Sequence, residues 1–363
     1  MRPWIESARA TFSPEIGLDL GTANTVVYDR LAGVIVAEPS MVVYDTRTNH
    51  IVAIGNEARA MEGRSPRRFR LVRPMRQGTI SDFRAAHALV GTLVDRALRS
   101  RPRLAPRLVT SVPGCATDIE CKAVEQAVRA AGARSTTYIS QAVAAAVGAG
   151  LDITETRAQM VVDIGGGTTE IAIIGISGVI RLRSVQIGGD HLDEAIIQRL
   201  AAERFLIGRQ TAEHLKIALG YIGRPPGNRP LVVSGTDLAA GAPRKRAISE
   251  EFVAEAIAPH LRRIARAICG VIETVPPEVA GDLVETGLVL TGGGSLVTGF
   301  AGEMHAQTNV PTTVASEPLL CVARGAGAIL ASATLLERLR PSTDRLTRWY
   351  QSLRIGMRES YSP

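Results

Sequence analysis

The stretch DIGGGTTE, from Asp163 to Glu170, combines a carboxylate, a bare backbone and two hydroxyls in a small space. Glycines let backbone N–H groups approach an anion that a Cβ atom would keep away, and hydroxyls add donors. A carboxylate repels phosphate directly, but it can hold a hydrated Mg²⁺ that bridges to phosphate oxygens. The stretch therefore predicts a site for a phosphate chain with its Mg²⁺, and a loose glycine turn is the alternative.

A second stretch repeats this pattern. IGLDLGTANTVVY and MVVDIGGGTTEIAI share an apolar run, an Asp, a Gly, small residues, a Thr and then β-forming residues, with Asp19 matching Asp163. Strands and helices follow each copy, so the economical interpretation is two α/β halves led by the same hairpin. If the two hairpins face each other, a triphosphate is clamped between two domains. Asp19 and Asp163 are then the candidates for the Mg²⁺ shell.

A third glycine loop, TGGGS from Thr291 to Ser295, follows an apolar strand. One such loop is weak evidence, but three loops that each follow a strand favour a nucleotide site. The sequence contains no GxxxxGK[ST] motif, which excludes a P-loop. It also lacks a GxGxxG motif with a correctly placed downstream acid, which disfavours a dinucleotide-binding fold.

The elements that must position these loops follow from hydrophobic periodicity. Strand–turn–strand units are predicted around residues 16–29 and 159–180, and a peripheral hairpin is predicted within 227–249. Residues 57–75 are interpreted as a basic connector. The predicted helices cover residues 82–99, 117–131, 192–204, 208–220 and 250–275.

Composition restricts the function classes. The chain has 363 residues, 45% of them hydrophobic, which suits two soluble domains. The four cysteines have no CxxC spacing and the six histidines are scattered, so a protein-ligated metal site is improbable. No signal peptide or membrane-spanning segment is visible, and we expect a cytoplasmic protein. The net charge of +7 permits contact with an acidic surface, but aromatic residues are too few for a nucleic-acid role.

Six motifs together resemble the bacterial actins of the MreB/Mbl family, within the actin–Hsp70–sugar-kinase superfamily. They are DLGTANT, RPMRQGTISDF, VVDIGGGTTE, IGGDHLDEAI, LTGGGSLV and CVARGAG, in order between about Ile16 and Leu330. The resemblance implies an α/β, actin-like ATPase fold with two related ribonuclease-H-like lobes, each with a small peripheral subdomain. It implies lobe I as residues 1–33, 69–146 and 314–363 with subdomain 34–68, and lobe II as residues 147–186 and 247–313 with subdomain 187–246.

The resemblance also implies ATP and Mg²⁺ as ligands and assigns residues to them. The first phosphate loop would be Asp19, Gly21, Thr22, Ala23 and Asn24, and the second Asp163, Gly165, Gly166, Gly167, Thr168 and Thr169. Glu213 and Lys216 would lie near the ribose and adenine, and Gly292, Gly293 and Gly294 would cover the base and α-phosphate. Without the resemblance, an ordinary i,i+3 ion pair on a helix is the simpler explanation for Glu213 and Lys216.

The chain departs from the family at one position that concerns hydrolysis. The family has a Glu-Glu-Pro run where this sequence has Ser140, Gln141 and Ala142, so the general base of that kind is absent. A Gln can still hold a water by donating and accepting hydrogen bonds. We therefore expect slow, Mg²⁺-dependent ATP hydrolysis with Gln141, Asp163 and Asp19 as the catalytic residues. The alternative is a pseudo-ATPase that binds ATP and scarcely cleaves it.

The family further implies partners. They are a second copy of the chain in paired filaments, the inner face of an anionic membrane, and membrane proteins of cell-wall synthesis. The basic loop 96–108 carries five arginines that would attract anionic headgroups, and the tail 335–358 has the pattern of an interfacial amphipathic helix. A solvated loop and a tail packed on the protein itself are the alternatives.

Three other functions compete with a filament that organises cell-wall synthesis. A non-polymerising nucleotide-binding regulator on the same fold is the main one, and the missing acids motivate it. A small-molecule kinase would need a catalytic Asp that faces a substrate pocket, and none can be assigned. An Hsp70-type chaperone would need a large region after the nucleotide domain.

Overall fold

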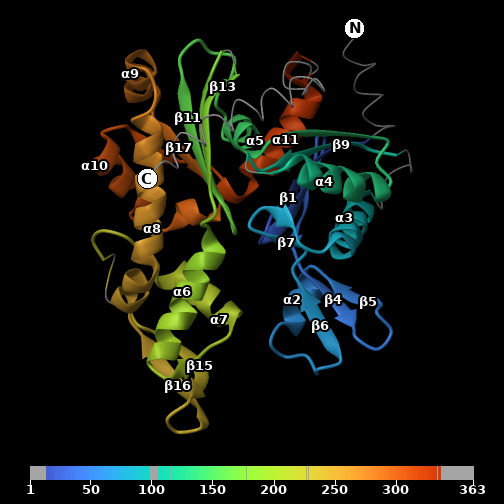
Figure 1. Cartoon of the computed structure of the whole chain (residues 1–363), viewed down its shortest axis with the longest axis vertical. Coiled ribbons are helices and arrows are strands. Elements are labelled where there is room, and N and C mark those ends of the chain that lie inside the picture. Colours follow the sequence, from blue (N-terminus) through green and yellow to red (C-terminus); the bar gives the residue numbers. More distant parts are fainter. Residues whose placement is uncertain are drawn as a thin grey trace.

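Two five-stranded sheets form the frame of the molecule (Figure 1). The computed structural model describes residues 14–98, 105–114, 116–176, 178–225, 227, 229–332 and 334–336. The first sheet has the order β10 (Ser135–Ser140), β9 (Arg107–Val112), β1 (Glu15–Leu20), β2 (Asn24–Asp29), β3 (Gly33–Pro39). The second has the order β13 (Gly178–Val185), β12 (Thr169–Gly175), β11 (Gln159–Ile164), β17 (Leu288–Thr291), β18 (Thr312–Val314).

The two sheets share one plan. In the first, β1, β2 and β3 pair antiparallel, while β9 and β10 add parallel strands on the other side of β1. In the second, β11, β12 and β13 pair antiparallel, and β17 and β18 add parallel strands beside β11. This confirms the prediction of two related α/β lobes, each led by the same hairpin.

Helices and sheets alternate through the molecule in five layers. The outer face of the first sheet is covered by α3 (Phe83–Leu98) and α4 (Asp118–Ala130). The outer face of the second sheet is covered by α8 (Glu250–Ile272), together with α9 (Pro277–Thr286) and α10 (Phe300–Thr308). The middle layer consists of α5 (Gln141–Gly148) and α11 (Cys321–Ala331). Strand β11 is buried on both faces, which fits the run of apolar residues Met160–Val162 before Asp163.

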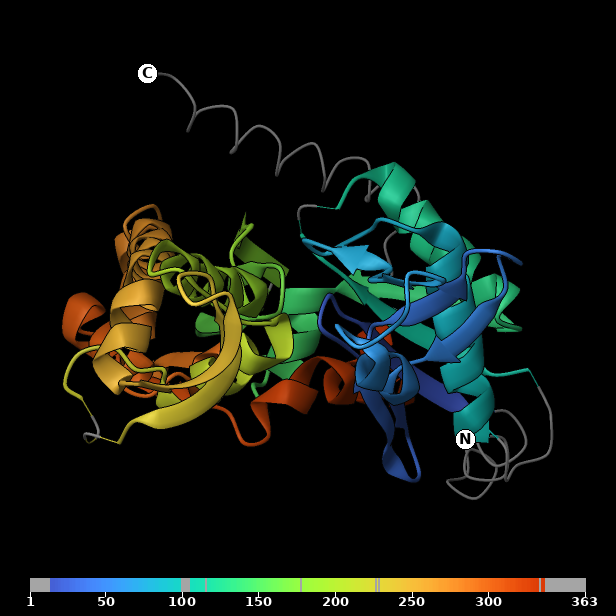
Figure 2. The ribbon, with the colours of Figure 1, turned by 90° about the horizontal axis from the view of Figure 1, so that it is seen from below.

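The two middle helices join the lobes (Figure 2). The small side chains of the alanines in α5 let α11 approach closely. Glycines in both helices, which have no side chain, let the two backbones come into contact. A Cβ atom on Gly148 would lie 1.8 Å from the carbonyl oxygen of Cys321, and one on Gly325 would lie 1.9 Å from that of Ala144. The lobes therefore meet along a backbone-to-backbone contact.

Each lobe carries a smaller set of elements at one end, on either side of the gap between the lobes (Figure 1). On the first lobe these are β4 (Val42–Asp45), β5 (Ile51–Ile54), β6 (Phe69–Val72) and α2 (Asn56–Met61). On the second they are α6 (Gly189–Ala202), α7 (Arg209–Leu219), β14 (Phe205–Leu206), β15 (Leu231–Asp237) and β16 (Ala242–Ile248). The exact boundaries of the predicted subdomains stay a prediction. Most of β3 falls within the predicted subdomain 34–68, but this strand pairs with β2 in the first sheet.

Most predicted elements are present, with two corrections. The stretch 57–75 is not a plain connector, since it contains most of α2 and all of β6. The glycine loop at 292–294 leads into a short 3₁₀ helix, Gly293–Leu296, rather than directly into an α-helix. A second 3₁₀ turn, Pro318–Leu320, precedes α11, and a two-strand ribbon, β7 (Met75–Arg76) and β8 (Thr79–Ile80), precedes α3.

Candidate functional site

The two predicted hairpin turns touch each other. A Cβ atom on Gly166 would lie 2.7 Å from the Cβ of Ala23, and one on Gly167 would lie 2.8 Å from Oγ1 of Thr22. Side chains at these glycines would therefore collide with the opposite turn. The structure thus brings the turn after β1 and the turn after β11 to one place between the lobes.

Asp19 lies at the end of β1, beside this contact. Its Oδ1 accepts a hydrogen bond from Oγ of Ser111 on the neighbouring strand β9, at 3.2 Å. Burial and, to a smaller extent, the negative charge of Asp163 raise the pKa of Asp19 to about 7, against the opposing effect of the Ser111 hydrogen bond. The two carboxylates are thus close enough to repel each other.

Asp163 holds the matching place in the second lobe. Its Oδ1 accepts from Oγ1 of Thr291 on β17 at 2.9 Å, and its Oδ2 accepts from Nε2 of Gln141 at 2.7 Å. Burial raises its pKa, against the effect of these two donors. Gln141 is the first residue of α5, which follows the first sheet, so this bond crosses between the lobes.

The donor set at this point fits a cation. Among the described residues, neither Asp19 nor Asp163 forms an ion pair with Lys or Arg, although burial disfavours the charged form of both. Two carboxylates whose charges repel each other, Asp163 buried and Asp19 partly buried, are stabilised by a divalent cation, and Mg²⁺ accepts oxygen ligands and water. The pair therefore suits a hydrated Mg²⁺.

The hydroxyls of the turns are not equivalent. Thr22 Oγ1 accepts from the backbone N–H of Gly78 at 3.1 Å, which leaves its own proton for another acceptor. Thr168 has no side-chain hydrogen bond to the described residues. In contrast, Thr169 is fully buried and donates to the carbonyl of Ile187 at 2.8 Å, so its proton is engaged within the protein. Thr22 and Thr168 are therefore the better donors for an anion.

The third glycine loop packs against the second hairpin. Gly292 has φ +75°, and a Cβ atom there would lie 2.4 Å from the carbonyl oxygen of Ile164 and 2.8 Å from Oδ1 of Asp163. A Cβ atom on Gly294 would lie 2.2 Å from Cγ2 of Ile164. Only glycine fits these two positions, so all three predicted loops, including Gly293 between them, meet in one region.

The start of α6 also belongs to this region. The backbone N–H groups of Gly189 and Asp190 donate to the carbonyls of Gly165 and Gly166, at 2.9 and 2.8 Å. Lys216 on α7 lies nearby, since its Nζ donates to the carbonyl of Gly189 at 3.2 Å. The second hairpin is thereby fixed to the small elements of its own lobe.

Glu213 and Lys216 do not pair with each other. Nζ of Lys216 lies 2.9 Å from Oδ1 of Asp193, a buried residue on α6. Oε2 of Glu213 lies 2.5 Å from Nη2 of Arg59, which belongs to α2 on the opposite lobe. The simple i,i+3 ion pair is therefore wrong: Lys216 contacts α6 of its own lobe, and Glu213 reaches the opposite lobe.

Sequence reasoning missed several residues of this region. Ser111 and Thr291 support the two aspartates from equivalent strands, and Gln77 and Gly78 form a turn against the first hairpin. The signal for the hydroxyls was available, because Ser111 and Thr291 stand near the ends of apolar strands in the two halves, RLVTSV and LVLT. The signal for the turn was RPMRQGTISDF, which was recognised only as a family motif.

Glu170, at the end of the opening stretch, was given no role. Its Oε2 accepts from the backbone N–H of Gly114 in the first lobe at 3.0 Å, and its Oε1 from Oγ of Ser184 at 2.5 Å. Burial, with a small contribution from the charge of Asp163, raises the pKa of Glu170 to about 7, against the effect of the hydrogen bonds from Ser184 and Gly114. Glu170 thus makes a second hydrogen bond between the lobes.

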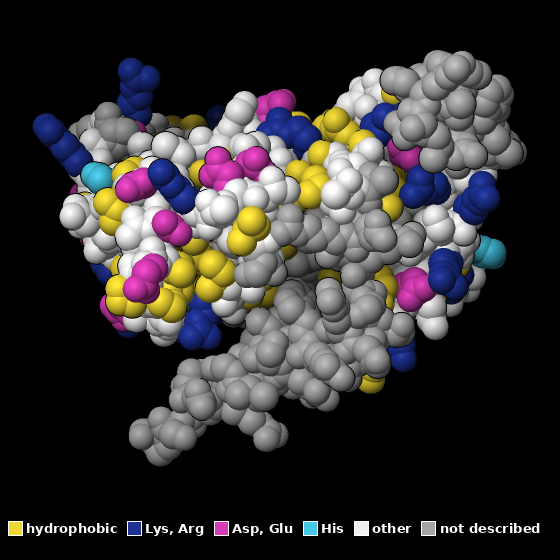
Figure 3. All heavy atoms as spheres, turned by 90° about the horizontal axis from the view of Figure 1, so that it is seen from above, with side chains coloured by type: hydrophobic (Ala, Val, Ile, Leu, Met, Phe, Trp, Pro, Cys, Tyr) yellow, Lys and Arg dark blue, Asp and Glu magenta, His cyan; other side chains and the backbone are white. Residues whose placement is uncertain are grey.

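The surface features predicted to contact a membrane fall partly outside the described residues. This applies to residues 99–104 of the basic loop and to 337–358 of the tail. Leu336, near the start of the tail, is buried with Ile329 and Leu330, so this part packs on the protein itself. No helix in the described ranges is both long and apolar enough to cross a bilayer. On the face seen in Figure 3, the described Lys and Arg side chains are interspersed with acidic and apolar ones.

Comparison with known proteins agrees with this geometry. The family model described as MreB/Mbl protein matches residues 13–338. The chain is 39% identical to the cell shape-determining protein MreB of Escherichia coli K12 over 332 residues, which is 90% of this chain and 96% of that protein. It is 34% identical to the cell shape-determining protein Mbl of Bacillus cereus, over 90% of this chain and 98% of that protein.

A solved structure has the same fold. MreB5 of Spiroplasma citri has been determined bound to ADP and bound to AMPPNP. The ADP form superimposes with a TM-score of 0.83 at 31% identity, over 87% of this chain and 96% of that one, and the AMPPNP form with 0.82 at 30%, over 90% and 97%. The actin-like fold predicted from the motifs is thereby confirmed, and the chain belongs to the MreB/Mbl family of cell shape-determining proteins.

Proposed function

We propose that the chain binds ATP with Mg²⁺ between its lobes and polymerises into filaments that organise cell-wall synthesis at the membrane. The observation that carries the nucleotide part is the meeting of two equivalent glycine turns beside two carboxylates that repel each other, Asp19 and Asp163. The two S. citri MreB5 structures, with ADP and with AMPPNP, support adenine nucleotides as the ligands.

Each side chain has a separate task in this proposal. Backbone N–H groups of the two turns, with the hydroxyls of Thr22 and Thr168, hold the phosphate oxygens. Asp19 and Asp163 hold the hydrated Mg²⁺, which supplies charge stabilisation at the transferring phosphate when it is bound. The glycine loop 292–294 covers the base and α-phosphate, and Glu213 and Lys216 face the adenosine.

Gln141 is the residue that we assign to the attacking water. A carboxylate only accepts hydrogen bonds, so the Gln141 amide turns its Nε2 toward Asp163 and its Oε1 away from it. Oε1 is then an acceptor for a water proton. It orients the water but is too weak a base to remove the proton, and we therefore expect slow hydrolysis.

The filament and membrane parts of the proposal rest on family membership. We propose paired filaments of this chain at the inner face of an anionic membrane, with the loop 96–108 and the tail 335–358 as contacts. Membrane proteins of cell-wall synthesis are the proposed partners. A non-polymerising, nucleotide-binding regulator is the second candidate, since no carboxylate stands at Gln141 to act as a general base.

Two measurements test the proposal. Isothermal titration with ATP and Mg²⁺ should give saturable binding that is lost in Asp19→Ala and Asp163→Ala, and its absence in the folded wild type would contradict the nucleotide part. The protein should then be incubated with ATP and acidic liposomes, sedimented and imaged. Paired filaments support the first candidate, and ATP binding without assembly at any salt concentration supports the regulator.

A further inference from the structure

The small elements of the two lobes touch across the gap, far from the helices that join the lobes (Figure 1). Arg59 on α2 pairs with Glu213 on α7, with 2.5 Å between Nη2 and Oε2. Next to this pair, Nε2 of Gln210 donates to the backbone carbonyl of Arg59 at 2.6 Å. Side chain and backbone of one residue in the first lobe are thus both held by α7 of the second.

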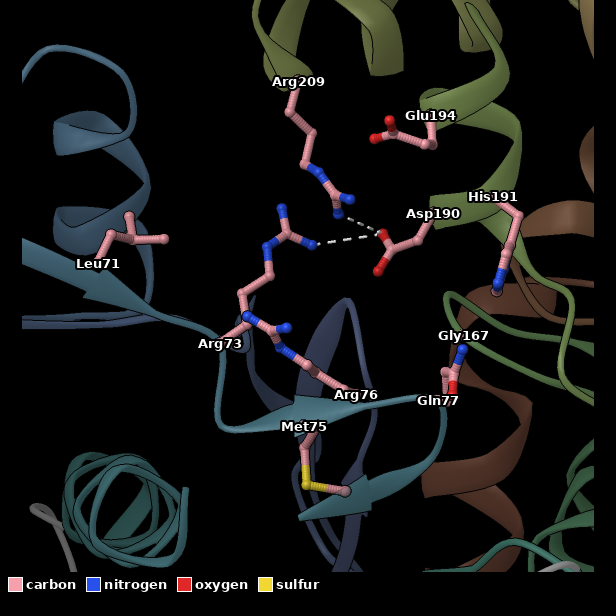
Figure 4. A pocket seen from close by; sticks show the side chains of 10 residues that line it. All are labelled: Leu71, Arg73, Met75, Arg76, Gln77, Gly167, Asp190, His191, Glu194 and Arg209. Atoms are coloured by element: carbon pink, nitrogen blue, oxygen red, sulfur yellow. Dashed lines mark hydrogen bonds and ion pairs between the residues drawn. The ribbon is translucent and has the colours of Figure 1, made fainter. Parts of the chain in front are cut away.

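A second bridge lies deeper. Asp190 at the start of α6 receives two arginines on the same oxygen, Arg73 from the first lobe at 3.3 Å and Arg209 from its own lobe at 3.2 Å. Figure 4 shows both guanidinium groups directed at Asp190. These residues line a cavity of about 610 Å³ whose wall also includes Gly167 of the second phosphate turn and Gln77 of the neighbouring turn. The bridge between Arg73 and Asp190 therefore lies next to the proposed phosphate site.

The Arg59–Glu213 pair is suited to reversible closure. The two side chains keep 39% and 30% of their exposure, and ion pairs in such positions contribute little individually, about 0–1 kcal/mol. The contact can therefore break when the lobes separate. The contact with Arg59 uses only one carboxylate oxygen of Glu213, Oε2. The other oxygen, Oε1, has no hydrogen bond to the described residues and is free to accept one from a ribose hydroxyl.

We propose that Arg59 is a positioning residue for the nucleotide. From the opposite lobe, Arg59 holds Oε2 of Glu213 and thereby fixes the orientation of this carboxylate. Oε1 of Glu213 then accepts a hydrogen bond from a ribose hydroxyl. This rests on the proposed function, in which Glu213 faces the adenosine. Because both contacts use one carboxylate, ribose binding and closure of the small elements reinforce each other, and by linkage each strengthens the other equally.

The test compares ATP with 2′,3′-dideoxy-ATP, which lacks both ribose hydroxyls. Wild-type protein should prefer ATP by about tenfold, the typical effect of one hydrogen bond to a charged group. In Arg59→Gln the affinity for ATP should fall about threefold, since a weak ion pair is lost, while that for the dideoxy nucleotide changes less than twofold. Titration calorimetry in Mg²⁺ measures both, and Arg59→Lys should restore part of the preference.

Arg68→Gln is the matched control. Arg68 pairs with Asp45 inside the same small subdomain and does not reach the other lobe, so both affinities should stay at wild-type values. Hydrogen exchange gives an independent readout, because ATP should protect the amides of α2 in the wild type and in Arg68→Gln but less in Arg59→Gln. This measurement also shows whether each variant is folded.

The outcomes separate the inference from the proposed function. Equal losses for ATP and dideoxy-ATP, or an unchanged preference in Arg59→Gln, would overturn the role of Arg59 and leave ATP binding intact. A folded wild type that binds neither nucleotide would overturn the proposed function and this inference with it.

Discussion

The two halves of the molecule hold Asp19 and Asp163 by similar contacts, with one difference. Asp19 and Asp163 each end the first strand of a hairpin, and each accepts from a hydroxyl on the neighbouring parallel strand, Ser111 or Thr291. Among the described residues, only Asp163 receives a further donor from the opposite lobe, the amide of Gln141. The repeated frame therefore supplies two carboxylates, and the unequal contact between the lobes distinguishes them.

The small elements of the two lobes differ more. On the first lobe they form a three-stranded sheet with one short helix, and on the second two longer helices pack against a three-stranded sheet. Arg59 lies in the small elements of the first lobe and Glu213 in those of the second, so this ion pair joins two unlike structures. The core of each half is thus a repeated sheet with a glycine turn, whereas the peripheral elements differ and contact the other half.

The largest expected difference between the two halves is in the rate of phosphate release after each aspartate is replaced by Asn. Asp163→Asn should slow Mg²⁺-dependent phosphate release by about 100-fold, because it removes a carboxylate and releases Gln141 as well. Asp19→Asn should cost only about tenfold, since it also removes a carboxylate but, beyond that, disturbs only the contact with Ser111. Phosphate release under single-turnover conditions measures both, and equal losses would show that the contact between the lobes has no catalytic weight.

Gln141 should affect hydrolysis more than binding. Gln141→Ala should slow phosphate release by roughly 30-fold, since the water loses its acceptor and Asp163 loses a donor. The affinity for ATP should stay within a few-fold of the wild type, because Gln141 makes no phosphate contact in the proposal. Parallel calorimetry and phosphate-release assays separate the two effects, and an unchanged rate would refute the role of Gln141.

The joint between the halves should be sensitive to one methyl group. Gly325→Ala places a Cβ against the carbonyl of Ala144, where backbone must move, and should lower the free energy of unfolding by about 2 kcal/mol. Gly91→Ala in α3 is the control, because its Cβ would lie 3.8 Å from that of Ala131, an ordinary contact. Denaturant unfolding should find this control neutral or stabilised, and similar losses in both variants would contradict the close joint.

A smaller effect concerns the periphery of the second half. Burial raises the pKa of Asp193 to about 6 from 3.8, against the attraction of Lys216. A carboxyl with a raised pKa stabilises the fold at low pH, and this stability is lost as the pH rises through about 6. Between pH 5 and 7 the wild type should lose about 1 kcal/mol relative to Asp193→Asn. Unfolding at both pH values measures this, and a constant difference would show that Asp193 titrates normally.

Several features could be predicted from the sequence because they depend on local pattern. The repeated hairpins, their aspartates and the main helices follow from residue spacing alone. The short helix α2 was missed because six residues give too weak a periodic signal. Ser111 and Thr291 were missed because each lies more than ninety positions from its aspartate, and sequence order does not reveal which parallel strands become neighbours.

The sequence by itself determined the residue types, the duplication of the phosphate turns and the loss of the acid at Gln141. The tertiary structure decided that Gln141 donates to Asp163, that Glu213 pairs with Arg59 rather than Lys216, and that Glu170 binds the backbone of the other lobe. The physical reason is that strands and turns depend on neighbouring residues, whereas contacts between the lobes join residues far apart in the sequence that only the packed chain brings together.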